Sequence, residues 1–283
     1  MAFAFRILAF LPVLIFVFSC SSNKGFLPYE GLKGQPTQVK ILDFEPLKEK
    51  STQEPKLESW EIYEFDKIGR IISYQVFRSD STPVTGGSRF YYSSKGPVQH
   101  QENFDLKGNL QSRTDFTYDK KERLLKSRTM AGGKETSLKE ISYDPKKPIS
   151  NTKITYYGKA VMQNSIDSLD EKGRIVMMTD YLPNGALKGK LGYVYDKKGN
   201  EILQEWYNSE GQLFQFYKKT YNERNEEILN ERFEIVAGEP VKSSSEIRYE
   251  YLYDSLGNQS QVSVKTGNMI YIKKVIVTYP NKK

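Results

Sequence analysis

The chain has 283 residues, of which 38% are hydrophobic, 13% aromatic and 27% charged, and its formal net charge is +7. That length fits one large domain or two small ones, and the low apolar content suits thin sheets better than a thick globular core. The single cysteine excludes an intramolecular disulfide framework. The single histidine excludes His-cluster metal sites and catalytic triads that need a second histidine.

The N-terminus has the pattern of an exported protein. Arg6 supplies a positive charge, and the apolar run Ile7–Phe18 is too short to span a bilayer. Residues 1–19 are therefore predicted to be a signal peptide. The sequence Val17-Phe18-Ser19-Cys20 resembles the lipobox of bacterial lipoproteins, and this resemblance implies that Cys20 becomes the acylated first residue of the mature chain.

The lipobox resemblance also implies a location. A membrane, reached through the N-terminal lipid, is the first expected partner, because several acyl chains together give stable anchoring. Ser21 differs from the acidic residue that retains many lipoproteins in the inner membrane, so we expect a lipid-anchored protein of the bacterial outer membrane. The alternative is ordinary secretion with Cys20 unmodified.

Two further segments follow the predicted signal peptide. Residues 20–57 are rich in Lys, Pro, Gly, Ser and Gln, and are predicted to be the lipidated cysteine and a tether. Within them, Val39–Phe44 is predicted to be a short strand that covers the first edge of a sheet. Residues 58–283 are predicted to be a β-repeat domain.

One turn motif recurs along this domain, and Tyr195-Asp196-Lys197-Lys198-Gly199-Asn200 is its clearest copy. The aspartate is expected to accept hydrogen bonds from the backbone two residues on, and the glycine to supply the positive φ that closes a type I turn with a bulge. The predicted turn-forming residues are Asp66, Gly69, Asp105, Gly108, Asp170, Gly173, Asp196, Gly199, Asp254 and Gly257.

The spacing of the motif predicts the fold. Its lead residue recurs in steps of 25 to 27 residues at Phe65, Tyr91, Tyr118, Tyr143, Leu169, Tyr195 and Tyr221. A second set of anchors lies midway, so each period of about 26 residues contains two strands and two turns. We expect an all-β array of antiparallel β-hairpin repeats that forms a long, curled or coiled meander sheet, with tyrosines stacked along one face.

Three turns depart from the motif. The turn after Tyr143 has no glycine, Glu122 stands at the glycine position after Tyr118, and Asn225 stands there after Tyr221. Asparagine tolerates positive φ, whereas glutamate does so poorly.

The repeats resemble known families. The Tyr195–Asn200 copy and its relatives resemble the YD repeats of the RHS family, whereas Tyr181–Leu187 and Tyr207–Leu213 are similar to MORN-type repeats. The RHS resemblance implies a coiled β-sheet shell, built in some members around a toxin and described in others as carbohydrate-binding. It brings no catalytic residues, and a C-terminal toxin segment is not expected here.

The recurring aspartates and the uneven distribution of charge can be explained without a catalytic or metal site. The recurring aspartates are expected to be structural, because one carboxylate per turn coordinates calcium poorly, and no metal or cofactor is expected. Residues 118–160 contain eleven Lys or Arg and five Asp or Glu, whereas residues 201–250 contain six and eleven. This segregation would steer an anionic partner or would simply keep the surface solvated.

We therefore expect a non-enzymatic, membrane-anchored lipoprotein, monomeric, that presents an extended β-repeat surface to a glycan or protein ligand. A polysaccharide hydrolase using two carboxylates and a purely structural envelope protein are the alternatives. A transmembrane β-barrel is not expected, because strands such as Arg123–Arg128 place charge on both faces. Nucleic acid is not an expected partner of an exported protein.

Overall fold

The computed structural model describes residues 32–94, 96–156, 161–244 and 246–280. The predicted signal peptide, Cys20 and the first part of the predicted tether lie outside the described residues. The described part of the chain contains no helix, and therefore no helix that could cross a bilayer.

The described chain folds into twenty β-strands, as alternating apolar and polar residues between Gly- and Asn-containing turns dictate. They are β1 (Gln38–Phe44), β2 (Leu47–Lys48), β3 (Leu57–Phe65), β4 (Ile71–Arg78), β5 (Ser88–Tyr92), β6 (Val98–Phe104), β7 (Leu110–Tyr118), β8 (Leu124–Ala131), β9 (Lys134–Tyr143), β10 (Ile149–Tyr156), β11 (Val161–Leu169), β12 (Ile175–Tyr181), β13 (Leu187–Tyr195), β14 (Glu201–Tyr207), β15 (Leu213–Tyr221), β16 (Glu227–Val236), β17 (Glu239–Lys242), β18 (Ile247–Tyr253), β19 (Gln259–Thr266) and β20 (Met269–Thr278).

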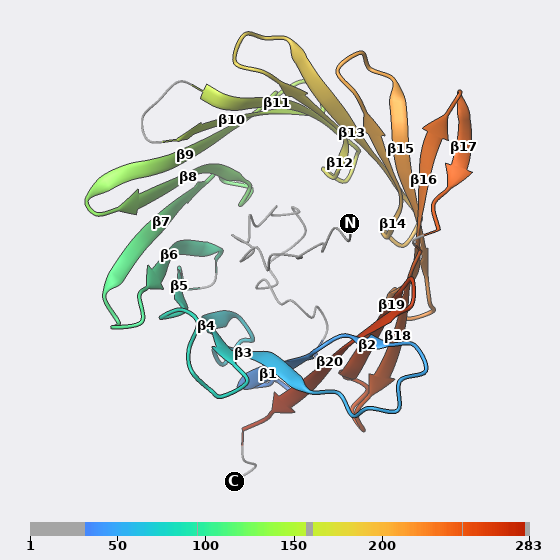
Figure 1. Ribbon diagram of the computed structural model, residues 1–283. Helices are drawn as coiled ribbons and strands as arrows, with labels where there is room; N and C mark the ends of the chain where they lie inside the picture. The colour runs from blue at the N-terminus through green and yellow to red at the C-terminus, as the bar shows by residue number, and fades with distance from the viewer. Residues whose placement is uncertain (1–31, 95, 157–160, 245, 281–283) are drawn as a thin grey trace, which may run out of the picture.

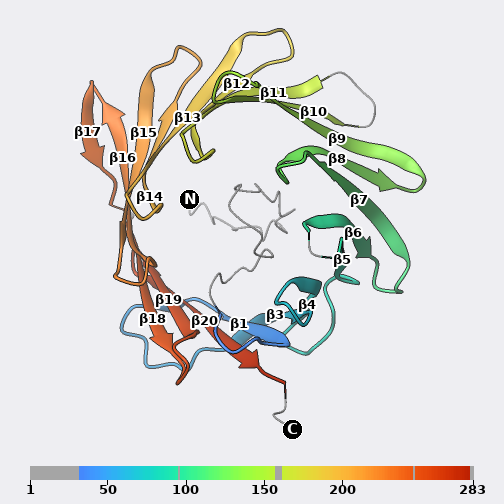
Figure 2. The ribbon, with the colours of Figure 1, turned by 180° about the vertical axis from the view of Figure 1, so that it is seen from behind.

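The strands form one antiparallel sheet that closes on itself, which Figures 1 and 2 show from its two ends. β1 completes the ring, because it pairs with β3 on one side and with β20 on the other. β2 and β17 each have a single neighbour, so eighteen strands make up the barrel wall. At ordinary strand spacing and tilt, eighteen strands enclose a ring about 35 Å across between backbones.

This closure corrects one expectation and extends another. The all-β, antiparallel hairpin array is confirmed. The open curled or coiled meander is wrong, because β1 pairs with both β3 and β20 and so closes the sheet. β1 lies inside the segment that the sequence assigns to the tether, yet it is part of the barrel wall. A closed ring leaves no edge strand along its wall, which removes the need for a separate edge cover.

Two seams in the wall are thin. β4 and β5 share only two residue pairs, Ser73 with Arg89 and Tyr74 with Ser88. β16 and β18 also share only two, because the end of β16 turns outward to pair with β17. β17 itself is a four-residue exposed strand that contains Pro240, and a proline removes a donor that a further strand would need.

The two faces of the wall differ in burial. The cross-strand register places nearly all buried strand side chains on one face, namely Val39, Ile41, Phe65, Ile71, Val98, Leu124, Ser150, Thr152, Ser165, Asp167 and Val275. On this face side chains also interact across an intervening strand, as Lys139 and Asp167 do across β10. Concave curvature makes side chains converge in this way, so this is the inner face of the barrel.

The inner face contains the one apolar cluster of buried residues in the described chain. Val39 and Ile41 of β1 are 0% and 2% exposed, and they pack with Phe65, Ile71 and Val275 from the neighbouring strands. Leu32, at the start of the described chain, packs against the same cluster. The hydrophobic core is therefore concentrated where the ring closes.

Candidate functional site

The turns separate onto two rims because the strands alternate in direction. One rim, here called the aspartate rim, carries the turns after β3, β5, β7, β9, β11, β13, β15 and β18, and it includes Asp66, Asp170, Asp196 and Asp254. The other, here called the far rim, carries the turn of Asp105 and Gly108 between β6 and β7. The predicted turn residues are thus spread around two ends of a barrel and do not converge on one site.

Each aspartate binds its own turn. In the turn after β11, the Asp170 carboxylate accepts hydrogen bonds from the backbone N–H groups of Lys172 and Arg174, both at 2.9 Å. Gly173 has a φ of 78°, and the other four predicted glycines, Gly69, Gly108, Gly199 and Gly257, also have positive φ. Glu122 and Asn225 adopt φ of 60° and 62° at the same position, so the turn geometry is kept where glycine is absent.

The turns are also connected to their neighbours by a contact that we call the Asp–Arg–Tyr latch. Arg174 Nε donates to Asp170 Oδ2 at 2.7 Å, and its guanidinium lies over the ring of Tyr195 at 4.2 Å. The Tyr195 hydroxyl then donates to the carbonyl of Ile175 at 2.9 Å. The same latch joins Asp66, Arg70 and Tyr92, and also Asp119, Arg123 and Tyr143.

The latch explains the period of the repeat. Each latch links one turn of the aspartate rim to the tyrosine that directly precedes the next turn on that rim. The turn after β11, for example, contacts Tyr195 at the end of β13. It also corrects one anchor, because Tyr92 makes the latch whereas Tyr91 stacks on His100 at 4.3 Å on the outer face. Sequence reasoning placed the anchor one residue too early because both positions are tyrosine.

The pKa values of the latch groups follow from these contacts. Burial alone would raise the pKa of Asp170, but hydrogen bonds from the Arg174 backbone and guanidinium outweigh it and hold the pKa below its usual value. The same balance lowers the pKa of Asp66 and Asp119. Burial raises the pKa of Tyr92 to about 12, so its hydroxyl stays a donor at neutral pH. These contacts therefore stabilise the turns in their charged, hydrogen-bonded form.

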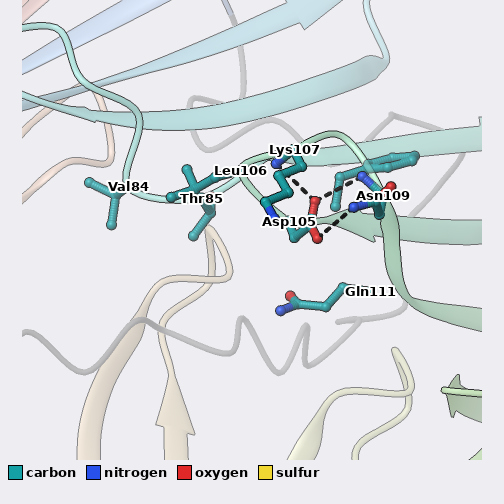
Figure 3. Close-up of a pocket in the computed structure, with 8 residues that line it drawn as sticks. Val84, Thr85, Asp105, Leu106, Lys107, Asn109 and Gln111 are labelled. Atoms are coloured by element: carbon teal, nitrogen blue, oxygen red, sulfur yellow. Dashed lines mark hydrogen bonds between the residues drawn. The ribbon is translucent and has the colours of Figure 1, made fainter.

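Asp105 lines a hollow on the far rim, shown in Figure 3. The hollow lies between the turn after β6 and the loop that contains Val84 and Thr85. The Asp105 carboxylate accepts hydrogen bonds from the backbone N–H groups of Lys107 and Asn109 and from the Asn109 side chain, drawn as dashed lines in Figure 3. Because the turn already uses this carboxylate, Asp105 is not free to bind a ligand in the hollow.

Charged side chains on the inner face form two networks outside the turns. Lys219 lies 2.7 Å from Glu201 and 4.0 Å from Glu227. On β10 and β11, Ser150 Oγ donates to Asp167 Oδ2 at 3.2 Å, while Asp167 Oδ1 has no hydrogen-bond partner among the described residues. Burial raises the pKa of Asp167 despite the Ser150 hydrogen bond and the nearby Lys139.

The Asp167 network bears on the hydrolase alternative. Asp180 lies diagonally across β11 and β12 from Asp167, a placement that puts Cβ atoms about 7–8 Å apart. That separation is within the range of glycosidase carboxylate pairs. However, Asp167 is 4% exposed, whereas a catalytic acid must reach its substrate. The pair therefore gives the hydrolase no support.

A third inner-face region has a different composition, and we call it the aromatic–amide patch. Cross-strand pairing over β13 to β16 places two rows of side chains next to each other. One row is Leu191, Trp206, Gln215 and Glu234, and the other is Tyr193, Gln204, Tyr217 and Arg232.

Trp206 is the exposed centre of this patch. It is 39% exposed, although it lies on the more buried face of the wall. The other tryptophan, Trp60, is on the outer face, where it stacks on Phe77 at 3.9 Å and lies under Lys40 Nζ at 3.7 Å. Trp60 is therefore already covered, and Trp206 is the tryptophan available to a ligand.

Sequence reasoning did not single out the patch or the latch. The arginine of the latch was visible as the residue after the turn glycine, but its stacking partner lies a repeat away. Trp206 and Gln204 lie on β14 and Gln215 lies on β15, and no common motif marks them, so only the strand register places the three side by side. No group of metal-ligating side chains occurs among the described residues.

Comparisons with known proteins give distant likenesses. No protein-family model and no curated protein sequence matches the chain, so the resemblance to YD and MORN-type repeats stays a prediction. A porin-like protein from Bacteroides uniformis is similar over 86% of this chain and 97% of its own, with 10% identity and a TM-score of 0.31. A porin-like protein from Bacteroides vulgatus is similar over 88% and 100%, with 11% identity and a TM-score of 0.31. The TcdB2-TccC3 structure is similar over 83% of this chain but 15% of its own, with 14% identity and a TM-score of 0.30. At these scores no property of those proteins is carried over to this chain.

Proposed function

We propose that this protein is a non-enzymatic, lipid-anchored component of the bacterial cell envelope that binds a glycan on the inner face of its barrel. The observation that carries the glycan is the aromatic–amide patch, with Trp206 exposed between Gln204 and Gln215. Sugar rings present C–H groups to an aromatic face and hydroxyls at their edges. An exposed indole beside amide side chains matches both.

The latch tyrosines do not take part in this function. Their hydroxyls are bound to backbone carbonyls and several of their rings lie under arginine, so they hold the wall together. The patch stands apart because its aromatic centre is exposed and its polar neighbours are amides and an Arg232–Glu234 pair, whose atoms lie 2.7 Å apart.

Tryptophan fluorescence tests the proposal directly, because the chain has two tryptophans in contrasting places. The protein is titrated with neutral and acidic oligosaccharides. We expect a ligand-dependent change in emission that survives Trp60→Phe and disappears in Trp206→Phe. Trp206→Ala should weaken binding roughly tenfold, as expected when an aromatic contact is lost.

The controls separate the patch from the fold. Gln204→Ala and Gln215→Ala should weaken binding without changing the thermal midpoint, since neither side chain is buried. If no oligosaccharide changes the emission of the Trp60→Phe variant, the glycan proposal fails. The purely structural envelope role then becomes the better one.

Membrane anchoring is proposed from the sequence of the N-terminus. The lipobox-like Cys20 is the attachment site we propose, and acyl burial of about 0.8 kcal/mol per CH₂ would hold the protein at the membrane. Labelled fatty acid should be incorporated by the natural chain and not by Cys20→Ala. Equal labelling of the two chains would contradict the lipoprotein assignment.

A further inference from the structure

The aspartate rim carries a concentration of lysine side chains that the proposed glycan function does not use. They occupy the tips of four successive turns, after β7, β9, β11 and β13, and all seven are exposed. We call them the lysine crown: Lys120, Lys121, Lys146, Lys147, Lys172, Lys197 and Lys198.

The crown is only partly neutralised by its surroundings, because its four turns contain nine Lys or Arg and six Asp or Glu, a balance of +3. In the same turns the aspartates are engaged by backbone N–H groups and, in two of the four, by the arginine of a latch. The remaining exposed acids at these tips are Glu122 and Glu171. None of the seven lysines is among the ion-paired side chains of the described residues.

The far rim over the same sector is different. Its described turns after β6, β8, β12 and β14 contain or adjoin three lysines, Lys107, Lys134 and Lys188, balanced by Asp105, Glu135 and Glu210, and the turn after β10 lies outside the described residues. In this sector the barrel is therefore polarised along its axis, with a cationic rim and a nearly neutral one. A solvated surface alone would not require this difference between two sets of otherwise similar turns.

The chain also enters the barrel at the cationic end. β1 begins at the aspartate rim, where the Phe65 N–H donates to the carbonyl of Thr37 at 3.0 Å. Just before it, the Lys33 N–H donates to Asn258 Oδ1, on the turn after β18, at 2.7 Å. The described chain therefore begins at the same rim as the lysine crown.

We propose that the aspartate rim is a docking surface for an anionic lipid bilayer, so that the barrel stands on the membrane with this rim against the headgroups. A ring of turn tips at one end fits a flat surface, and each lysine near an anionic leaflet contributes about 1 kcal/mol. A lipid chain together with a basic patch gives firmer attachment than either alone. The inference does not depend on the glycan proposal.

Vesicle binding by a chain without an acyl group tests it. The mature-length chain from residue 20, carrying Cys20→Ser, is mixed with vesicles of phosphatidylcholine alone or with phosphatidylglycerol, and the bound fraction is measured by sedimentation. We expect binding only to the anionic vesicles, reduced by added salt. A rim variant with Lys120→Ser, Lys121→Ser, Lys146→Ser and Lys147→Ser should lose on the order of 1,000-fold in partitioning.

A matched control removes the same charge from the other end. Lys48→Ser, Lys50→Ser, Lys107→Ser and Lys134→Ser are all exposed far-rim changes and should leave partitioning within about twofold. Equal loss in both variants would overturn the proposal in favour of a net-charge effect. Absence of anionic-vesicle binding would also overturn it, as would equal rim-dependent binding to a soluble anionic polysaccharide.

Because all eight changes are at exposed positions, both variants should melt like the parent chain. Oligosaccharide titration of the rim variant separates the two proposals. Loss of vesicle binding with unchanged Trp206 fluorescence supports docking as a separate property, whereas loss of both signals would contradict it.

Discussion

At the scale of single residues, the protein is held together by polar contacts that neighbouring hairpins exchange. Arg174 is central to one such contact, because it pairs with Asp170 and covers Tyr195. A wall one sheet thick cannot bury many apolar side chains, so hydrogen bonds and ring stacking contribute a larger share of stability than in a thick core. The latch supplies both kinds of contact, hydrogen bonds and ring stacking, at several turns of the wall.

The Tyr195 hydroxyl offers a direct test of the latch. Tyr195→Phe removes the hydrogen bond to the Ile175 carbonyl and should lower the free energy of unfolding by about 1 kcal/mol, measured by urea denaturation. Tyr181→Phe is the matched control, because no hydrogen bond of the Tyr181 hydroxyl is found among the described residues. Equal effects of the two changes would mean that the latch contributes nothing.

The turn aspartates predict how stability depends on pH. The pKa of Asp170 is lowered in the folded protein, so its contribution is fully present above the unfolded pKa of about 3.9 and is lost as pH falls through the folded value. Asp66 and Asp119 share this sign. The thermal midpoint should therefore fall steeply below about pH 4.

Asp170→Asn provides the comparison. The variant should melt below the natural chain at neutral pH and show a smaller fall in acid, because one of the titrating groups is gone. Asp167 has the opposite sign, since burial raises its pKa, and its protonation in acid partly offsets the loss. An unchanged acid profile in Asp170→Asn would contradict the role given to the turn.

At the scale of elements, β1 matters more than its length suggests. It is one of the shorter strands of the wall, yet it joins the two ends of the repeat array and contains the most buried side chains of the described chain, Val39 and Ile41. The hairpins alone would form an open sheet with two unpaired edges, and such edges invite association between molecules.

Ile41→Ala tests this role. The side chain is 2% exposed between β3 and β20, so its truncation should cost about 2–5 kcal/mol in unfolding free energy. Ile276→Ala on the outer face of β20 is the control, because that side chain is 49% exposed and its loss should cost well under about 1 kcal/mol. Similar costs at both positions would show that the closing strand is not a special point.

At the scale of the whole molecule, a closed ring opens first where its wall is thinnest. The seams between β4 and β5 and between β16 and β18 have two residue pairs each, whereas β15 and β16 share seven. Backbone amides at the two seams should therefore exchange with solvent faster than those between β15 and β16. Hydrogen exchange followed by mass spectrometry measures this difference, and uniform protection around the ring would contradict it.

Closure also places the basic and acidic segments of the chain on different sides of the ring. The basic segment 118–160 and the acidic segment 201–250 lie on different sides of the ring, as the positions of β8 to β10 and β14 to β17 in Figure 1 show. In an open sheet these sectors would lie far apart along a line. In the barrel they produce a field across its diameter, which orients any charged molecule that approaches.

The local structure of this protein can be derived from its amino-acid sequence alone. Aspartate, glycine and a following arginine or asparagine specify the turn through contacts within five residues, and the alternation before each anchor specifies strands. Such information is local, which is why Asp170 and Gly173 could be assigned their positions without a structure. It also allowed a period of about 26 residues to be identified despite the irregular turns at Glu122 and Asn225.

Closure of the sheet, and the contacts that result from it, could not be derived from the sequence. Closure depends on the pairing of β1 with β20, two segments more than two hundred residues apart, and no local pattern encodes such a pairing. The inner face and the exposure of Trp206 follow from closure and register. A hairpin repeat specifies its nearest neighbour, whereas the ring is set by the sum of twist and curvature over the whole wall.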